Sequence, residues 1–196
     1  PADTHPAYAE LHCLSSFSFQ HGASQPDELV ERAAALGYSA LAITDACSVA
    51  GVVQAHEAAR RCGLKLLLGA TFAVSRSGVG GGGRVNRGSA VDGGAGLEEA
   101  PAGGFGAIVL ARNLQGWGQL CQFITAARRR APKGTYHLGW DGAQEQALWA
   151  SLRDCEVLLD FSSAINMEAA YAVSMCAKGI FGSNLWLAMS RLLGPD

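Results

Sequence analysis

Short apolar runs alternate with helical stripes of apolar residues along the first third of the chain. Residues 8–14 alternate between polar and apolar side chains, which is typical of a β-strand. Pro26, followed by Asp27 and Glu28, indicates a helix start, because the positive end of a helix dipole favours acidic side chains. An apolar stripe at helical spacing follows, and Gly37 is expected to end this helix.

The next segments have the pattern of two buried strands on either side of a second helix. Residues 38–44 form a short apolar run, which is typical of a parallel strand covered on both faces. A helix is expected over 49–61, ended by 62–63, and a third strand over 64–72. Strands that alternate with helices predict the α/β class, with parallel pairing and right-handed crossovers.

A glycine-dominated segment then interrupts the pattern, and it divides the chain into parts 1–74, 75–104 and 105–196. Glycine loses the most backbone entropy on folding and offers no side chain to bury, so we predict a disordered loop or linker over 75–104. A loop that cradles phosphate is the alternative. It receives little weight, because GxxxxGK[ST] is missing and no helical pattern follows directly.

Regular patterning returns in the last part of the chain. Asn113 is a candidate N-cap for a helix that runs to Arg130 and is broken at 132–134. The other expected elements are a strand over 105–111, a helix over 144–153, a strand over 155–160 and a helix over 165–178 closed by Gly179. Periodicity does not decide between strand and helix for the segment from Asn184 onwards.

Composition indicates a globular chain with ample material for a core. Apolar residues make up 49% of the 196 residues, and the net charge is −2, without the basic surplus of a stand-alone nucleic-acid binder. One local exception is the basic group Arg128, Arg129, Arg130 and Lys133. Such a group is usually a solvated helix end, and contact with DNA or another protein domain is the second interpretation.

Two further properties concern compartment and cysteine chemistry. No apolar run is long enough to cross a bilayer, and the first ten residues lack the features of a signal peptide, so we expect a cytoplasmic location and no membrane partner. The six cysteines are scattered without a CxxC pair. They are therefore expected to be mostly buried small hydrophobes, not a disulfide framework or a zinc knuckle.

Several motifs together resemble one known family. They are ELHCLS at 10–15, FSF at 17–19, GAS at 22–24, ALAITD at 40–45, AG at 50–51, LLGA at 67–70, VLARN at 109–113, TAARRRAPKG at 125–134, LWLA at 185–188 and GPD at 194–196. In this combination the chain resembles the N-terminal PHP (polymerase and histidinol phosphatase) domain of bacterial C-family DNA polymerases, most closely their error-prone branch. The resemblance implies a distorted (β/α) barrel, here incomplete, with metal ligands at the strand ends.

Several ligand positions of that family hold residues that cannot bind a metal. Strand residues two apart point to the same side, so the family's HxH motif aims two imidazoles at one site, but here the pair is His12 and Leu14. His21 stands where many relatives carry an aspartate, and it can still ligate. The family's Thr-Asp-His motif ends in Ala46 after Asp45.

The remaining ligand positions of the family also lack the expected residues. Thr71 stands where active relatives have a glutamate, and no later Asp-x-His motif is present in the sequence. A catalytic zinc-type site needs about three protein ligands, and only His12 and His21 match. We therefore predict a vestigial site and no cofactor, with Zn, Mn or Mg bound only if the site survives. Simpler interpretations are a hydrogen-bonded His12, a loop His21, and an Asp45 that caps the following turn or helix.

Three hypotheses about function follow from the resemblance. The first is a fragment of an error-prone DNA polymerase, itself a non-catalytic scaffold, with DNA synthesis in damage tolerance performed by the parent enzyme. Its partners would be the remaining polymerase domains or translesion-synthesis proteins, and DNA through the parent enzyme. The second is a free-standing metal-dependent phosphoesterase. The third is a non-catalytic module that docks onto replication proteins. An incomplete barrel exposes strand edges, so association or poor solubility is expected.

Overall fold

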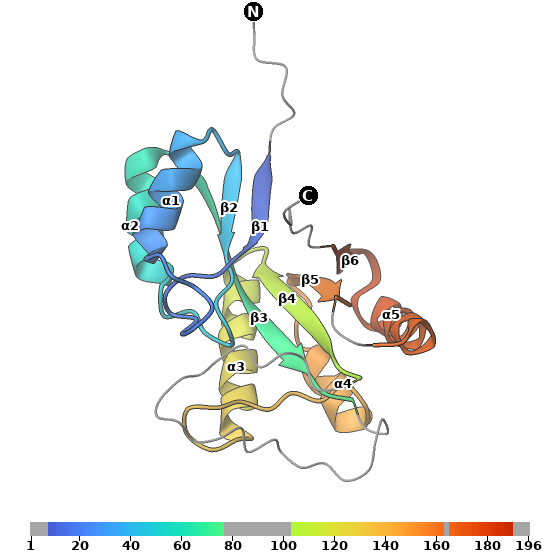
Figure 1. The fold of residues 1–196 in the computed structure, drawn as a ribbon. Helices are drawn as coiled ribbons and strands as arrows, with labels where there is room; N and C mark the ends of the chain where they lie inside the picture. The colour runs from blue at the N-terminus through green and yellow to red at the C-terminus, as the bar shows by residue number, and fades with distance from the viewer. Residues whose placement is uncertain (1–7, 77–102, 163–164, 190–196) are drawn as a thin grey trace, which may run out of the picture.

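Within residues 8–76, 103–162 and 165–189, which the computed structural model describes, the chain forms one curled six-stranded sheet covered by helices (Figure 1). The strands are β1 (Ala9–Cys13), β2 (Ala40–Ile43), β3 (Lys65–Val74), β4 (Phe105–Ala111), β5 (Cys155–Asp160) and β6 (Leu185–Ala188). The helices are α1 (Pro26–Ala35), α2 (Val52–Cys62), α3 (Leu114–Arg129), α4 (Ala143–Trp149) and α5 (Met167–Phe181), and a 3-10 turn, η1, spans Gly182–Asn184. The expected α/β class and partial barrel are confirmed.

The pairing of the strands confirms one prediction only in part. The strands lie in chain order from β1 to β6, and β1, β2 and β3 pair in parallel, as do β5 and β6. The parallel pairing predicted from the first three strands is therefore confirmed for them, but it does not extend to the whole sheet, because β4 runs antiparallel to both β3 and β5. A single crossover helix is what forces parallel pairing. Such a helix has no sequence signal between β3 and β4, and two helices, α3 and α4, lie between β4 and β5.

The helix ends follow their local sequence with one exception. Helix α1 begins at Pro26 and α3 begins after Asn113, whose side-chain oxygen accepts a hydrogen bond of 2.9 Å from the backbone N–H of Gly116. Helix α5 does not stop at Gly179, as the sequence predicts, but continues to Phe181, which is buried. Because tertiary packing of Phe181 outweighs the weak helix propensity of glycine, the helix ends only at Gly182.

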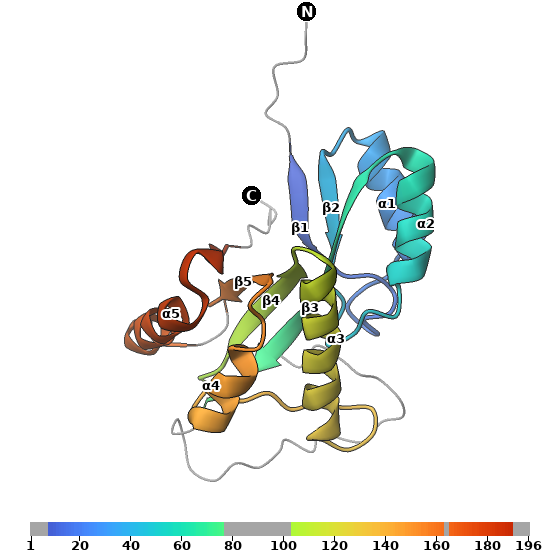
Figure 2. The same ribbon diagram turned by 180° about the vertical axis from the view of Figure 1, so that it is seen from behind.

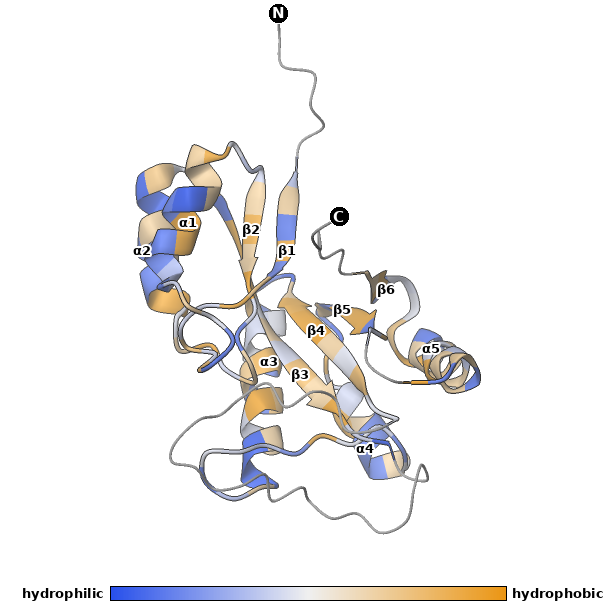
Figure 3. Cartoon of the chain, in the orientation of Figure 1, coloured by the Kyte–Doolittle hydropathy of each residue, from blue (hydrophilic) through white to orange (hydrophobic). Residues whose placement is uncertain are grey.

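Three hydrophobic clusters hold the helices and the sheet together. The largest lies between the outer face of β3, β4 and β5 and the helices α3, α4 and α5, and Figure 2 shows α3 lying along the back of β3 and β4. A second cluster joins α1 and α2 to β2, and a small third cluster covers the inner face of the sheet. The apolar bands of β2 and β4 are visible in Figure 3. No helix of the described residues is both long and apolar enough to span a bilayer.

Strand β3 connects the two halves of the sheet. Its first four residues pair with β2 and the rest, from Gly69 onwards, pair with β4. At the change of partner, a Cβ on Gly69 would lie 2.5 Å from the carbonyl oxygen of Val109, so only glycine fits there. Of the predicted loop over 75–104, residues 77–102 lie outside the described residues, as does the chain beyond Met189.

Candidate functional site at the strand ends

A buried carboxylate forms the centre of the site. Asp45 follows β2 and is 1% exposed. One of its oxygens, Oδ1, accepts hydrogen bonds of 2.7 Å from the backbone N–H of Ser15 and from the Ser18 hydroxyl. The other, Oδ2, accepts a hydrogen bond of 2.7 Å from the Ser15 hydroxyl. The charge is therefore stabilised by three donors from the loop between β1 and α1, which is how a buried ion avoids a large desolvation cost.

The network also fixes the backbone around Asp45. The Ser18 hydroxyl, besides donating to Asp45, accepts a hydrogen bond of 3.0 Å from the N–H of Ala46. Helix α2 begins at Val52, and its N-cap residue, Gly51, provides no side-chain cap. The expectation that the Asp45 carboxylate caps the following turn or helix is wrong, because its oxygens instead accept hydrogen bonds from Ser15 and Ser18, which lie 30 and 27 residues earlier in the chain. Asp45 thus joins the ends of two neighbouring strands.

His12 lies beside this network, on β1. Its Nδ1 is 2.9 Å from the hydroxyl oxygen of Thr44, which is fully buried. Burial lowers the pKa of His12 below its usual value, while the negative charges of Asp160 and Glu10 oppose that shift. Since Asp160 ends β5, its influence on a β1 residue reflects the curl of the sheet.

An irregularity in β1 affects how His12 is placed. The register of β1 against β2 shifts between Glu10 and Cys13, so the regular alternation of side chains is interrupted there. The backbone N–H of His12 donates a hydrogen bond of 2.9 Å to the Glu10 carboxylate. The backbone of His12 is therefore held by Glu10, and its imidazole is held by the contact with Thr44.

The positions that lack family ligands are filled by ordinary packing and backbone pairing. Ala46 is 3% exposed and forms an isolated parallel bridge with Thr71. The N–H of Thr71 donates to the carbonyl of Asp45 at 3.1 Å, and the N–H of Cys47 donates to the carbonyl of Thr71 at 2.9 Å. Leu14 is partly buried. With apolar side chains at two ligand positions and the Asp45 oxygens already engaged, these residues do not fit a divalent metal centre.

His21, the second predicted ligand, lies in the loop between β1 and α1 and is exposed. Its backbone N–H donates to the carbonyl of Ser18 at 3.0 Å. Within the described residues, no group of three or more His, Cys, Asp or Glu side chains is arranged to hold a metal ion. Sequence reasoning missed the part played by Ser15 and Ser18, although a charged residue after an apolar run signals that polar partners must come from elsewhere.

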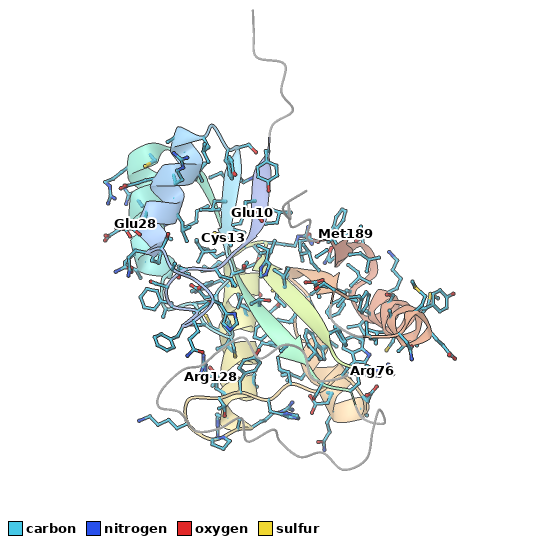
Figure 4. The ribbon with its side chains drawn as sticks, viewed as in Figure 1. Glu10, Cys13, Glu28, Arg76, Arg128 and Met189 are labelled. Atoms are coloured by element: carbon cyan, nitrogen blue, oxygen red, sulfur yellow. The ribbon has the colours of Figure 1, made fainter. Side chains whose placement is uncertain are left out.

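The predicted basic group lies at the end of α3, and two of its members have structural contacts. Arg128, labelled in Figure 4, donates from Nε to the carbonyl of Cys47 at 3.0 Å. Arg130 forms an ion pair of 2.6 Å with Glu145. Arg129 and Lys133 are exposed to solvent. Contact with nucleic acid through this group stays a prediction, with Arg129 and Lys133 as its accessible members.

The cysteines are all reduced, and their exposure differs. Cys47 and Cys155 are fully buried, three others are partly buried, and Cys62 is exposed. Burial raises the pKa of Cys47 to about 12, although the neighbouring Arg128 opposes the shift. Cys47 also has a backbone φ of 44°, a left-handed conformation that is rare for a residue with a side chain. Its hydrogen bond from Arg128 helps to hold this turn.

The curled sheet thus carries a histidine on β1 and an aspartate shortly after β2. The sequence matches the PHP domain family over residues 10–188, and the chain belongs to that family. Its relatives include error-prone DNA polymerases from Dechloromonas aromatica, 38% identical over 97% of this chain, and from Ralstonia nicotianae, 39% identical over 94%. A third, from Burkholderia mallei, is 47% identical over 68% of the chain. The matched part is a small fraction of each relative, 16%, 15% and 11% of its length respectively.

Solved structures show a looser likeness. An amidohydrolase from Chromobacterium violaceum with bound sulfate and no metal aligns over 63% of this chain and 34% of its own, at 26% identity and a TM-score of 0.42. A candidate metal-dependent phosphoesterase from Bifidobacterium adolescentis aligns over 91% of this chain and 53% of its own, at 19% identity and a TM-score of 0.43.

Proposed function

We propose that this chain is a non-catalytic PHP scaffold of an error-prone DNA polymerase. The curated relatives support the parent activity, because they carry that name and match most of this chain. In this proposal, DNA synthesis in damage tolerance belongs to the parent enzyme, and the remaining polymerase domains are the partners of the scaffold. DNA is then reached through the parent enzyme.

One observation carries the non-catalytic part of the proposal. The Asp45 carboxylate, at the point where the family places a metal-binding motif, accepts three short hydrogen bonds from Ser15 and Ser18. A carboxylate engaged by three donors holds two strand ends together and is poorly placed to bind an ion as well. The apolar Leu14 and Ala46 reduce the ligand set below the three or so that a catalytic centre needs.

Metal content and hydrolysis together test the proposal. The purified chain is dialysed against Zn²⁺ or Mn²⁺, freed of unbound ion and analysed by elemental mass spectrometry. Its hydrolysis of p-nitrophenyl phosphate and of a DNA 3′-phosphate is measured in parallel. We expect substoichiometric metal and no turnover above the buffer. Stoichiometric metal, together with turnover that His12→Ala abolishes and His56→Ala leaves intact, would instead establish a metal-dependent phosphoesterase; His56 is an exposed histidine on α2 and serves as the control.

Contact of the scaffold with DNA is proposed only for the exposed basic residues. Arg128 and Arg130 are engaged by Cys47 and Glu145, which leaves Arg129 and Lys133 accessible. Two phosphate contacts give a slope of about −1.8 in a plot of log affinity against log salt for duplex DNA. Arg129→Ala combined with Lys133→Ala should remove that salt dependence in fluorescence anisotropy. A slope that the double variant leaves unchanged would place any DNA contact elsewhere.

A further inference from the structure

Helix α5 carries an apolar stripe on the face that points away from the protein. Met167, Tyr171 and Met175 are 85%, 67% and 57% exposed. They are four residues apart in sequence and therefore follow one another along a single side of the helix. The opposite side packs into the main core through Val173, Ala177 and Phe181. Figure 1 shows α5 at the edge of the molecule, and in Figure 3 its ribbon carries both hydrophobic and hydrophilic colours.

The other residues of this outward face are small or charged. Ala172 and Gly179 are exposed beside the stripe, and a Cβ on Gly179 would have no neighbouring atom within 4 Å. Glu168 lies in the first turn and Lys178 in the last turn, and both are exposed. Lys178 also donates to the carbonyl of Gly182 at 2.8 Å, which keeps its ammonium group near the end of the helix.

We propose that this face of α5 packs antiparallel against the same face of a second copy of the chain. A twofold axis that runs between the two helices, perpendicular to both and at the level of Val173, pairs residues that lie equally far on either side of that position. Met167 of one copy then faces Gly179 of the other, Glu168 faces Lys178, and Tyr171 faces Met175. Each pair thus joins a large side chain to a small one, an acid to a base, or an aromatic ring to a thioether.

The symmetry of the pattern favours a second copy over an unrelated partner. An interface between identical copies related by a twofold axis must be self-complementary, so each residue needs its complement at the mirrored position of the same helix. Three pairs on α5 satisfy that condition about one axis. Antiparallel pairing also brings opposite ends of the two helix dipoles together, and sulfur–aromatic contacts are favourable.

Sedimentation equilibrium of the full 196-residue chain tests the proposal. A single helix pair buries less than the roughly 1,200 Å² of a standard interface, so concentrations from about 1 to about 500 μM are needed. We expect a monomer–dimer equilibrium whose dissociation constant rises about 30-fold or more with Tyr171→Glu. The matched control is Val53→Glu on α2, since Val53 is 68% exposed and Tyr171 is 67% exposed. It should leave association unchanged, and circular dichroism should show that both variants are folded.

Charge reversal gives the most specific readout. Glu168→Lys alone and Lys178→Glu alone each place like charges together at both ends of the helix pair, so each should weaken dimerisation. An equimolar mixture of the two variants should recover dimerisation as a heterodimer, because both contacts between positions 168 and 178 then join opposite charges.

Three outcomes would overturn the proposal. One is a chain that stays monomeric over the whole concentration range. Another is a dimer that Tyr171→Glu does not weaken, and the third is a mixture no more associated than either charge variant alone. In each case a different occupant would have to cover the face, such as another domain of a longer polymerase.

Discussion

Replacing Ser18 by alanine removes two hydrogen bonds at the centre of the site. The Ser18 hydroxyl donates to Asp45 at 2.7 Å and accepts from the N–H of Ala46 at 3.0 Å, and the residue is fully buried. A hydrogen bond to a charged group contributes about 1.5–3 kcal/mol and a neutral one about 0.5–1.5 kcal/mol. We therefore expect Ser18→Ala to lower the free energy of unfolding by about 2–4.5 kcal/mol, the sum of the two contributions.

Urea unfolding followed by tryptophan fluorescence measures this loss, and thermal unfolding provides a second reading. For a chain of this size, the expected loss corresponds to a fall in Tm of about 5–15 °C. The matched control is Ser48→Ala, because the Ser48 hydroxyl accepts a single bond of 3.2 Å from the N–H of Ala50. That variant should lose less than about 1 kcal/mol.

A double-mutant cycle with Asp45→Ala tests the pairing itself. If Ser18 acts through the carboxylate, the coupling free energy between the two substitutions should be about 1–3 kcal/mol. A loss below about 0.5 kcal/mol for Ser18→Ala, or a coupling near zero, would refute the reasoning. The carboxylate would then be stabilised without this hydroxyl, and the metal-free interpretation of the site would lose its main support.

Three further predictions concern pH, thiol reactivity and packing. Burial lowers the pKa of His12 in the folded protein below 6.5, the usual value for histidine, so below that pH the unfolded chain binds a proton that the folded protein does not. The free energy of unfolding should therefore fall as the pH drops below 6.5. His12→Gln should flatten this pH dependence in urea titrations. Ellman's reagent should modify exposed Cys62 rapidly but buried Cys47 only on unfolding. Gly69→Ala should lower the free energy of unfolding by about 1–3 kcal/mol, because the new Cβ would lie 2.5 Å from a backbone oxygen. The control is Gly118→Ala on α3, where a Cβ meets no atom within 4 Å, and it should stabilise the protein by about 0.5–1 kcal/mol. Thermal unfolding measures both.

Local signals in the sequence predict most of the elements, because they depend on neighbouring residues. Pro26 and Asn113 mark helix starts that the structure confirms, and Gly63 ends α2 in a left-handed conformation. The antiparallel direction of β4 could not be predicted, because strand direction depends on how the chain returns to the sheet, and residues 77–102 give no pattern for that connection. The end of α5 was wrong for a similar reason, since burial of Phe181 is a tertiary effect.

The candidate site was predicted in its position but not in its contacts. The apolar run before Asp45 places the carboxylate at a strand end. The family resemblance identifies the nearby positions at which this chain carries no metal-binding residue. The partners of Asp45 could not be predicted, because Ser15 and Ser18 lie 30 and 27 residues away in sequence. Such contacts follow from the pairing of β1 with β2 and from the path of the loop after β1.

Strand β3 couples the unfolding of the two halves of the sheet. Its ten residues form hydrogen bonds with β2 at one end and with β4 at the other, and they support the cores on both sides. A register slip in one half would therefore misplace every side chain in the other. The two halves are thus bound into one cooperative unit, and the backbone amides of β3 should be among the last to exchange with deuterium.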